Sequence, residues 1–278
     1  MLPAAHELQR FLDIATEAAL AGGGVLQAYA GKVEAVEKGR PGDLLTEADQ
    51  AAEAAILAVI RRHFPEHGVL AEESGRMGAT ASEFVWAIDP LDGTTNYAHQ
   101  YPFYATSVGL LVHGVPCVGV VFVPFLQELF RAAHGLGATR NRQPIRVSQT
   151  AALAQSLLVT GFAYDRRETP DNNYAEFCHL THLTQGVRRG GAAAVDLAYV
   201  ACGRLDGYWE RGLSAWDMAA GVVIVEEAGG RVTAYDQGEF EIGSGRILAT
   251  NGLIHSALSR ELLRVKPLPD DSLPGHSG

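Results

Sequence analysis

The sequence predicts an α+β fold in which helices cover layered sheets. Three observations predict it: amphipathic helical segments, a run of strand-like segments joined by tight turns, and the absence of the regular βαβ alternation that is typical of a Rossmann fold. Of the 278 residues, 47% are apolar and 19% are charged, as in folded globular proteins. A chain of this size can bury one large core or two closely packed halves.

The first 65 residues are expected to form two helices. Apolar residues spaced three and four apart indicate an amphipathic helix over residues 4–30,. The glycines at 22–24 would weaken this helix or let another backbone approach closely. A second helix is predicted from Thr46, a favourable N-cap, to His63, and Pro65 ends it,.

The middle of the chain predicts strands. Short apolar segments at 69–71 and 84–88 each lead into acidic residues. Residues 105–112, 115–123 and 126–133 predict a meander with a tight turn at His113-Gly114, followed by a loop over 135–144. The second half mixes both types, with strands expected at 157–160, 205–209, 231–235 and 246–250 and helices at 172–185, 192–203, 217–228 and 252–263. The proline-rich polar end, residues 266–278, is expected to be disordered.

Composition argues against several classes of protein. The net charge is -10, from 32 acidic and 22 basic residues, and no lysine- or arginine-rich run occurs, which argues against a broad nucleic-acid surface. If the substrate is an anion, divalent cations would offset this acidity. The longest apolar run, residues 115–123, is too short to cross a bilayer. Charged residues interrupt any secretory signal near the N-terminus.

The three cysteines carry little chemistry. Cys117, Cys178 and Cys202 are widely spaced and form no C-x-x-C pair. Reduced, mostly buried thiols in a cytoplasmic protein are therefore expected rather than disulfides or a zinc site. The ten histidines form no metal-binding or nucleophilic pattern,.

The most specific motif is DPLDGTT at residues 89–95. An apolar strand is expected to end at Asp89, and Pro90 should stop its hydrogen-bond ladder,. A short turn would then bring Asp89 and Asp92 to one point. An ordinary turn with an aspartate N-cap explains one of these residues but not the other.

The same turn would supply further polar groups. Gly93, Thr94 and Thr95 would present backbone N–H groups to an anion at a helix N-terminus. The two carboxylates and the free carbonyl of Leu91 are hard oxygen ligands, which suit Mg²⁺ or Mn²⁺ better than zinc. The motif therefore predicts a metal-assisted site for a phosphate-like group.

Three further acidic clusters are weaker signals by themselves. Residues 43–49 carry acidic side chains at the start of the second helix, where such residues commonly offset the helix dipole,. Glu72-Glu73 follows a buried strand, and such pairs are usually solvated. Asp217 opens a helix, where an N-cap is the simpler interpretation. None of these motifs contains a lysine or arginine.

Together, Asp49, Glu72-Glu73, DPLDGTT, and Trp216-Asp217 followed by Gly229-Gly230 resemble the inositol monophosphatase family of lithium-sensitive, magnesium-dependent phosphatases. The resemblance spans residues 5–263. Residues 189–217 are similar to the bacterial inositol monophosphatase type and less similar to the bisphosphate-nucleotidase branch. The resemblance implies a layered αβαβα sandwich, like that of fructose-1,6-bisphosphatase, and a homodimer. One phosphatase domain would cover 1–265, with metal ligands mainly in 1–145 and substrate contacts in 146–265.

The resemblance also implies roles for individual residues. One metal would be held by Glu72, Asp89 and the Leu91 carbonyl. A second would be held by Asp89, Asp92 and Asp217, and a weaker third would lie near Asp49. Catalysis would fall to Glu72, Thr94 and Asp89, and the substrate contacts would be Asp92, Gly93, Thr94, Gly191, Ala193, Glu210 and Asp217.

The implied reaction is magnesium-dependent hydrolysis of a small phosphate monoester, foremost myo-inositol monophosphate, by an activated water. The same chemistry on fructose 1,6-bisphosphate, histidinol phosphate or NADP stays open, as does a regulatory binding role in a transcription complex. Ala192 departs from the family, whose members usually have serine or threonine there. If that hydroxyl contacts the substrate, the preference for inositol weakens.

Overall fold

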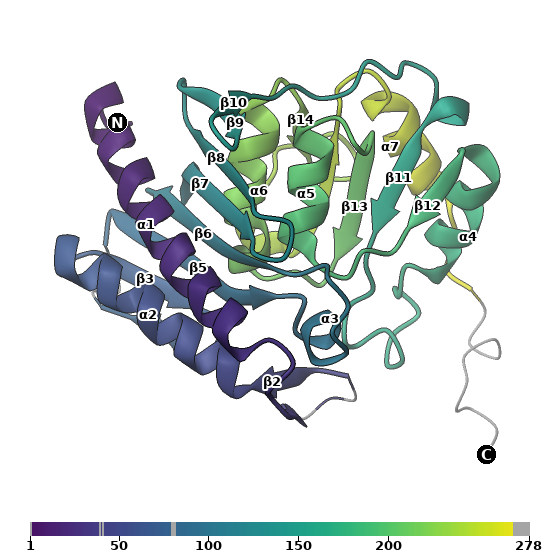
Figure 1. The fold of residues 1–278 in the computed structure, drawn as a ribbon. Helices are drawn as coiled ribbons and strands as arrows, with labels where there is room; N and C mark the ends of the chain where they lie inside the picture. The colour runs from purple at the N-terminus through teal and green to yellow at the C-terminus, as the bar shows by residue number, and fades with distance from the viewer. Residues whose placement is uncertain (1, 39, 41, 79–81, 269–278) are drawn as a thin grey trace.

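The computed structural model describes residues 2–38, 40, 42–78 and 82–268 (Figure 1). The helices are α1 (Ala5–Tyr29), α2 (Glu47–His63), α3 (Thr94–Ala98), α4 (Tyr174–Leu183), α5 (Ala193–Ala201), α6 (Ala215–Glu227) and α7 (His255–Arg264). The strands are β1 (Ala35–Glu37), β2 (Leu44–Thr46), β3 (Gly68–Ala71), β4 (Gly75–Met77), β5 (Phe84–Asp92), β6 (Ala105–Val112), β7 (Val115–Val123), β8 (Glu128–Ala133), β9 (Gly137–Arg140), β10 (Gln143–Pro144), β11 (Leu157–Thr160), β12 (Gly186–Arg188), β13 (Gly207–Arg211), β14 (Arg231–Thr233) and β15 (Arg246–Thr250).

The strands form two large sheets and one short ribbon. The larger sheet has the order β10-β9-β8-β7-β6-β5-β3-β4, and only β3 and β5 pair in parallel. The smaller sheet has the order β12-β11-β13-β15-β14, with β11 parallel to both of its neighbours. Strands β1 and β2 form an antiparallel ribbon.

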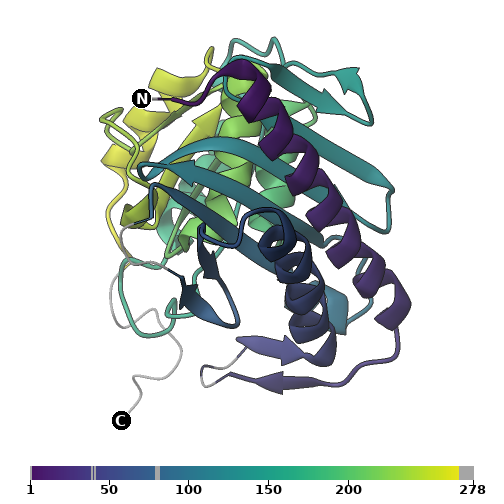
Figure 2. The same cartoon turned by 90° about the vertical axis from the view of Figure 1, so that its left-hand side faces the viewer.

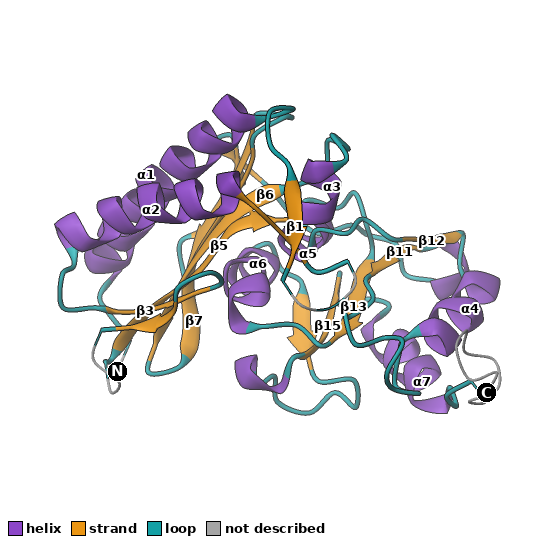
Figure 3. Ribbon diagram, turned by 90° about the horizontal axis from the view of Figure 1, so that it is seen from below, coloured by secondary structure: helices purple, strands orange, loops and turns teal. Residues whose placement is uncertain are grey.

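Helices cover both sheets and separate them. α1 and α2 pack on the outer face of the larger sheet (Figure 2). α5 and α6 fill the space between the two sheets, and α4 and α7 cover the far face of the smaller one (Figure 3). The order of layers is therefore αβαβα, which confirms the expected sandwich.

Strand β7 shows why the longest apolar run belongs to the core. Val120 and Phe122 face the outer helices, whereas Val121 and Val123 face α5 and α6. A strand covered on both faces is apolar at consecutive positions. In the described part of the chain, no helix combines the length and apolarity needed to cross a membrane.

Close helix packing depends on glycines at two places. Gly109 and Gly119 lie opposite each other on β6 and β7, and α6 crosses them so closely that a Cβ on Gly119 would lie 2.2 Å from the Ala220 carbonyl oxygen. In α1, Cβ atoms on Gly22 and Gly23 would meet the side chains of Ile56 and Phe122. The triple glycine therefore does not interrupt α1. Gly22 and Gly23 leave room for side chains of α2 and β7 to approach the helix closely, rather than for another backbone.

The structure corrects the expected path of the chain at Pro90. β5 runs on to Asp92, because a register shift between Asp89 and Asp92 removes the proline from the regular ladder while Asp92 still pairs with Ala105. A bulge of this kind re-aims side chains at a strand end. The two aspartates therefore belong to the strand itself.

Other differences are smaller. The expected loop over 135–144 contains β9 and β10, joined by Asn141 and Arg142, which both have positive φ. Turns with this backbone usually have glycine at the second position, so the arginine removes the sequence signal for a hairpin. Most other predicted elements of the second half shift by one to three residues at their ends. Cys178 is exposed, contrary to the expectation of mostly buried thiols, and all three cysteines are free. Of the expected disordered end, residues 269–278 lie outside the described residues.

Candidate active site

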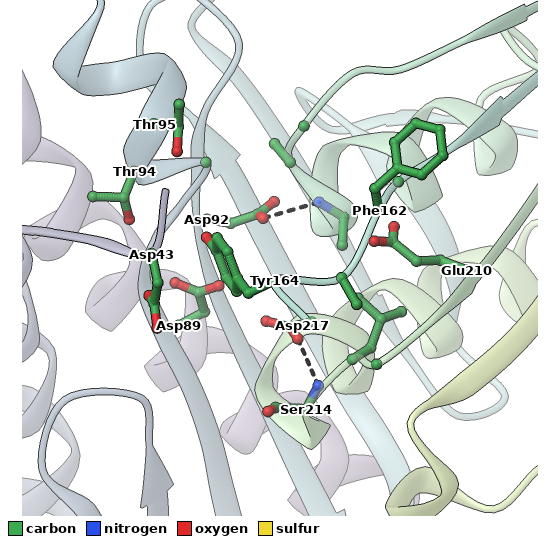
Figure 4. A pocket seen from close by; sticks show the side chains of 18 of the residues that line it. Asp43, Asp89, Asp92, Thr94, Thr95, Phe162, Tyr164, Glu210, Ser214 and Asp217 are labelled. Atoms are coloured by element: carbon green, nitrogen blue, oxygen red, sulfur yellow. Dashed lines mark hydrogen bonds between the residues drawn. The ribbon is translucent and has the colours of Figure 1, made fainter. Parts of the chain in front are cut away.

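A cavity of about 430 Å³ opens where β5, α5 and α6 converge, and acidic side chains line it. Figure 4 shows carboxylates from both halves of the chain facing this space. The acidic residues that line it are Asp43, Glu72, Asp89, Asp92, Glu210 and Asp217. The sequence-predicted clusters therefore meet, apart from Asp49.

The turn after β5 is tied together by its own polar groups. The Leu91 N–H donates to Asp89 Oδ1 at 3.0 Å, and the Thr94 hydroxyl lies 3.1 Å from both the Leu91 carbonyl and Asp49 Oδ1. Gly93 has φ of 93°, a backbone conformation that glycine adopts without strain,. The motif is thus a preorganised turn that aims Asp89 and Thr94 into the cavity.

Asp92 has a structural role that the sequence did not predict. It accepts hydrogen bonds from the N–H groups of Ala193, Ala194 and Val195, at 2.9, 2.8 and 3.4 Å. These groups form the first turn of α5, so Asp92 caps a helix about a hundred residues further along the chain. The capping bonds hold the two halves of the site in register.

Glu72 follows β3 and is held by its neighbours. Its N–H donates to the Ile88 carbonyl at 3.1 Å, and its carboxylate pairs with Lys38 at 3.0 Å. The buried Glu53 of α2 accepts a hydrogen bond from the Glu73 N–H at 2.9 Å and another from the Ser74 hydroxyl. Lys38 lies outside the recognised motifs and supplies a positive charge that they lack.

Asp49 and Asp217 occupy equivalent places in two helices. Each is the third residue of its helix and accepts from the backbone N–H of the N-cap residue: Thr46 at 2.7 Å for Asp49 and Ser214 at 2.6 Å for Asp217. The predicted N-cap Thr46 is confirmed, whereas the interpretation of Asp217 as an N-cap is wrong: Ser214 is the N-cap of α6, and Asp217 is the third residue of a capping box,. Asp217 also lines the cavity, whereas Asp49 is fully buried behind Thr94.

The acidic side chains raise one another's pKa. Burial raises the pKa of Asp89 well above its usual value, and the charges of Glu72, Asp92 and Asp217 add to it. Burial likewise raises the pKa of Asp217, and it raises that of Asp92 to about 7 although the α5 N–H groups oppose the shift. The metal-free site thus holds more negative charge than it can stabilise.

This donor set fits a hard divalent cation. The groups that converge are carboxylates, a backbone carbonyl and hydroxyls, which are the ligands that Mg²⁺ prefers. Within the described residues, no three His, Cys, Asp or Glu side chains already stand at metal-binding spacing. The converging carboxylates nevertheless line one cavity, and a cation bound among them would relieve their repulsion,.

The far end of the cavity is less acidic. Glu210, at the end of β13, is 8% exposed and accepts a hydrogen bond from the Tyr208 hydroxyl at 2.6 Å. Burial raises its pKa to about 7, against the effect of the Tyr208 hydrogen bond and of Arg189. Gly161 lies so close that a Cβ there would be 2.2 Å from the Glu210 carboxylate. Glu210 is thus a buried carboxylate of the cavity wall, and the neighbouring Arg211 pairs with Asp165.

The first turn of α5 completes this end. Gly191 has φ of 86°, and its carbonyl lies 3.4 Å from the Asn96 amide nitrogen. The Ala193 N–H already donates to Asp92, so other atoms of Ala193 face the cavity. Ala192, the residue that departs from the resembled family, is 2% exposed and is the N-cap of α5.

Sequence reasoning missed several lining residues. Lys38, Tyr164 and Arg189 line the same cavity. Arg189 was noticed only as part of a basic pair, and Tyr164 lies in a segment with no recognisable motif. Only Lys38 had a sequence signal, because it shortly precedes the acidic residues of 43–49.

Comparison with known proteins agrees with this geometry. The profile of the inositol monophosphatase family matches residues 7–266. Inositol-1-monophosphatase of Synechocystis sp. is 64% identical over 92% of this chain and 90% of the relative. The structure of inositol monophosphatase from Anabaena (Nostoc) sp. superposes with a TM-score of 0.88 at 66% identity, covering 94% of this chain and 98% of that one.

A relative with a different name is more distant. The protein named Nus factor SuhB of Escherichia coli is 39% identical over 89% of this chain and 93% of the relative. The family profile covers nearly the whole chain, and both the fold and the ordered acidic motifs agree with it. The chain therefore belongs to the inositol monophosphatase family.

Proposed function

We propose that this protein hydrolyses a myo-inositol monophosphate to inositol and phosphate. The observation that carries the proposal is one cavity with two different ends. The phosphate end, defined by Glu72, Asp89, Asp92 and Asp217, suits metal ions and a phosphate. The alcohol end, defined by Gly191, Ala193 and Glu210, suits hydroxyl groups. A phosphorylated polyol matches both ends at once.

At the phosphate end, we assign two or three Mg²⁺ ions, which Mn²⁺ could replace. Glu72, Asp89 and the Leu91 carbonyl would hold the first ion, and Asp89, Asp92 and Asp217 the second. Asp49 would lie near the weaker third ion. It would affect the reaction largely by orienting Thr94, whose hydroxyl donates a hydrogen bond to it. When bound, the ions supply a Lewis acid for the phosphate and lower the pKa of the attacking water.

The protein's own groups position the reactants. Glu72 and the Thr94 hydroxyl orient the attacking water, and the backbone N–H groups of Gly93 and Thr94 bind phosphate oxygens. Glu210 accepts hydrogen bonds from adjacent hydroxyls of the substrate, as a carboxylate can. Tyr208 holds Glu210 in place through its hydroxyl. Together these contacts fix the ester bond in line for attack.

The remaining expectations complete the proposal. Residues 1–265 would act as one phosphatase domain, because Asp92 of the first half caps α5 of the second. By analogy with the family, the enzyme would be a lithium-sensitive homodimer. The acidic, cysteine-poor composition supports a cytoplasmic location.

A substrate panel tests the proposal. Phosphate release is measured with malachite green on inositol 1-phosphate, fructose 1,6-bisphosphate, histidinol phosphate and NADP, with Mg²⁺ and with EDTA. We expect the highest kcat/KM on inositol 1-phosphate and no turnover in EDTA. Higher kcat/KM on another substrate would replace inositol phosphate as the assignment. No release from any substrate would favour the regulatory role that the name of the Escherichia coli relative suggests.

A further inference from the structure

Tyr164 lies at the phosphate end of the cavity, although it belongs to no motif. It sits in the segment between β11 and α4, and 45% of it is exposed. In Figure 4 its ring stands between Asp43 and Asp217, in front of Asp89. Tyr164 therefore lines the same cavity as the groups proposed to bind metal and phosphate, and its exposed side chain is open to a ligand there.

The segment around Tyr164 is fixed on both sides. Asp165 receives two hydrogen bonds from Arg211, at 2.8 and 2.7 Å, and this pair ties the segment to the end of β13 beside Glu210. The Ala163 carbonyl accepts from both the backbone N–H and the guanidinium of Arg166, each at 3.1 Å. The Asp165–Arg211 pair is bidentate, so it fixes the relative orientation of the two side chains in addition to pairing their charges,. Tyr164 is thus placed by its neighbours.

The surroundings of the hydroxyl determine what it can bind. A tyrosine hydroxyl is ordinarily protonated at neutral pH, and the carboxylates of Asp43, Glu72, Asp89 and Asp217 that line the same cavity disfavour its ionisation,. The phenol therefore stays protonated and acts as a hydrogen-bond donor at neutral pH. Glu72, Asp89 and Asp217 belong to the phosphate end, so the acceptor that the substrate brings to this place is a phosphate oxygen.

We propose that Tyr164 is a substrate-binding residue whose hydroxyl donates a hydrogen bond to a non-bridging phosphate oxygen, and that the Asp165–Arg211 pair positions it. This inference rests on the proposed function, since it assumes that the phosphate binds beside Asp89. It predicts that the contact depends on the phosphate and is independent of the alcohol. Inorganic phosphate should use the same contact.

The test compares Tyr164→Phe with wild type on two substrates and one ligand. A hydrogen bond to a charged acceptor corresponds to roughly a 10-fold effect or more. We expect kcat/KM to fall about 10-fold on both inositol 1-phosphate and p-nitrophenyl phosphate. Calorimetry with Mg²⁺ and inorganic phosphate should show weaker phosphate binding by a similar factor. Tyr101→Phe, at a 55% exposed tyrosine that does not line the cavity, is the matched control.

Each outcome decides the question. Unchanged phosphate binding would overturn the inference, and a loss confined to inositol 1-phosphate would move the hydroxyl contact to the alcohol. An inactive wild-type enzyme would refute the proposed function, while the calorimetric comparison would still test Tyr164. If Asp165 acts through Tyr164, then Asp165→Asn should weaken phosphate binding in wild type but add little in the Tyr164→Phe background. Full additivity would show that the pair does not position Tyr164.

Discussion

The two ends of the cavity are built in different ways. The phosphate end takes Asp89, Asp92 and Thr94 from one short stretch at the end of β5, where hydrogen bonds within the stretch hold Asp89 and Thr94, and Glu72 and Asp217 join them from other elements. The alcohol end takes Gly191 from the start of α5 and Glu210 from the end of β13, and each depends on a different neighbour. A local motif thus fixes the chemistry, whereas the packing of distant elements fixes the choice of alcohol.

If this contrast is correct, substitutions at the phosphate end should affect every substrate. Asp89→Asn removes a charge shared between two proposed metal positions, and kcat/KM should fall by about 10³-fold or more on all phosphate esters. Asp49→Asn acts from behind Thr94 and should cost about 10- to 100-fold. Steady-state kinetics at saturating Mg²⁺ measure both. Equal losses would mean that Asp49 is as central as Asp89.

Buried carboxyl groups at both ends of the cavity should make the stability of the metal-free protein depend on pH. Asp92 and Glu210 have folded-state pKa values of about 7, above their ordinary values. The folded protein then binds more protons than the unfolded chain between about pH 4 and 7, so stability falls as pH rises through this window. The largest loss of stability is about 4 kcal/mol for the rise of Asp92 from 3.8 to about 7 and about 3 kcal/mol for the rise of Glu210 from 4.5 to about 7,.

Magnesium should separate the two contributions. Thermal melts of metal-free protein from pH 5 to 8 should show a falling Tm. Saturating Mg²⁺ should remove the Asp92 part, because a bound cation stabilises that carboxylate, and should leave the Glu210 part. Glu210→Gln should then reduce the remaining fall in Tm by the Glu210 part, while Asp196 and Glu73, whose pKa values burial also raises, keep the rest. A Tm that rises with pH in the metal-free protein would contradict the raised pKa values.

A single substitution at the alcohol end should discriminate between substrates. Glu210→Gln preserves shape but removes a charged acceptor, which costs about 1.5–3 kcal/mol, or roughly 10- to 100-fold. We expect that loss in kcat/KM on inositol 1-phosphate and near wild-type activity on p-nitrophenyl phosphate, which has no hydroxyls to recognise. Comparable losses on both substrates would assign Glu210 to the phosphate end.

The same contrast explains what the sequence could predict. Asp89, Asp92 and Thr94 were found because seven consecutive residues carry the motif. The first helix was found from its apolar spacing, and the second from its N-cap Thr46 and from Pro65 after it. Tyr164 and Arg189 were missed because nothing near them in the chain indicates what they face, and Lys38 was missed although it shortly precedes the acidic residues of 43–49. The capping of α5 by Asp92 depends on contacts about a hundred residues apart, which no local pattern encodes.

The prediction that the strand ends at Asp89 was wrong for a related reason. Proline usually stops a strand ladder, but here Pro90 falls where the register shifts between Asp89 and Asp92, so the strand continues. Whether a proline ends a strand depends on the partner strand, in this case β6. The sequence of β5 alone does not contain that information.

The smallest expected effect lies where the two ends meet, at Ala192. A serine N-cap normally stabilises a helix by about 1 kcal/mol relative to alanine, because its oxygen accepts an N–H of the first turn. In α5 the N–H groups of Ala194 and Val195 already donate to Asp92. Ala192→Ser should therefore change stability by less than about 0.5 kcal/mol and kcat/KM on inositol 1-phosphate by less than about 3-fold.

A second background makes this small effect informative. In an Asp92→Ala protein the first-turn N–H groups lose their acceptor, so the serine of Ala192→Ser should then contribute the full amount of about 1 kcal/mol. Denaturant unfolding of the four proteins in this cycle measures the difference. Equal effects in both backgrounds would mean that Asp92 does not occupy the cap in solution. A large gain in kcat/KM from the serine would instead show that a hydroxyl at this position contacts the alcohol directly, and that its absence weakens the preference for inositol.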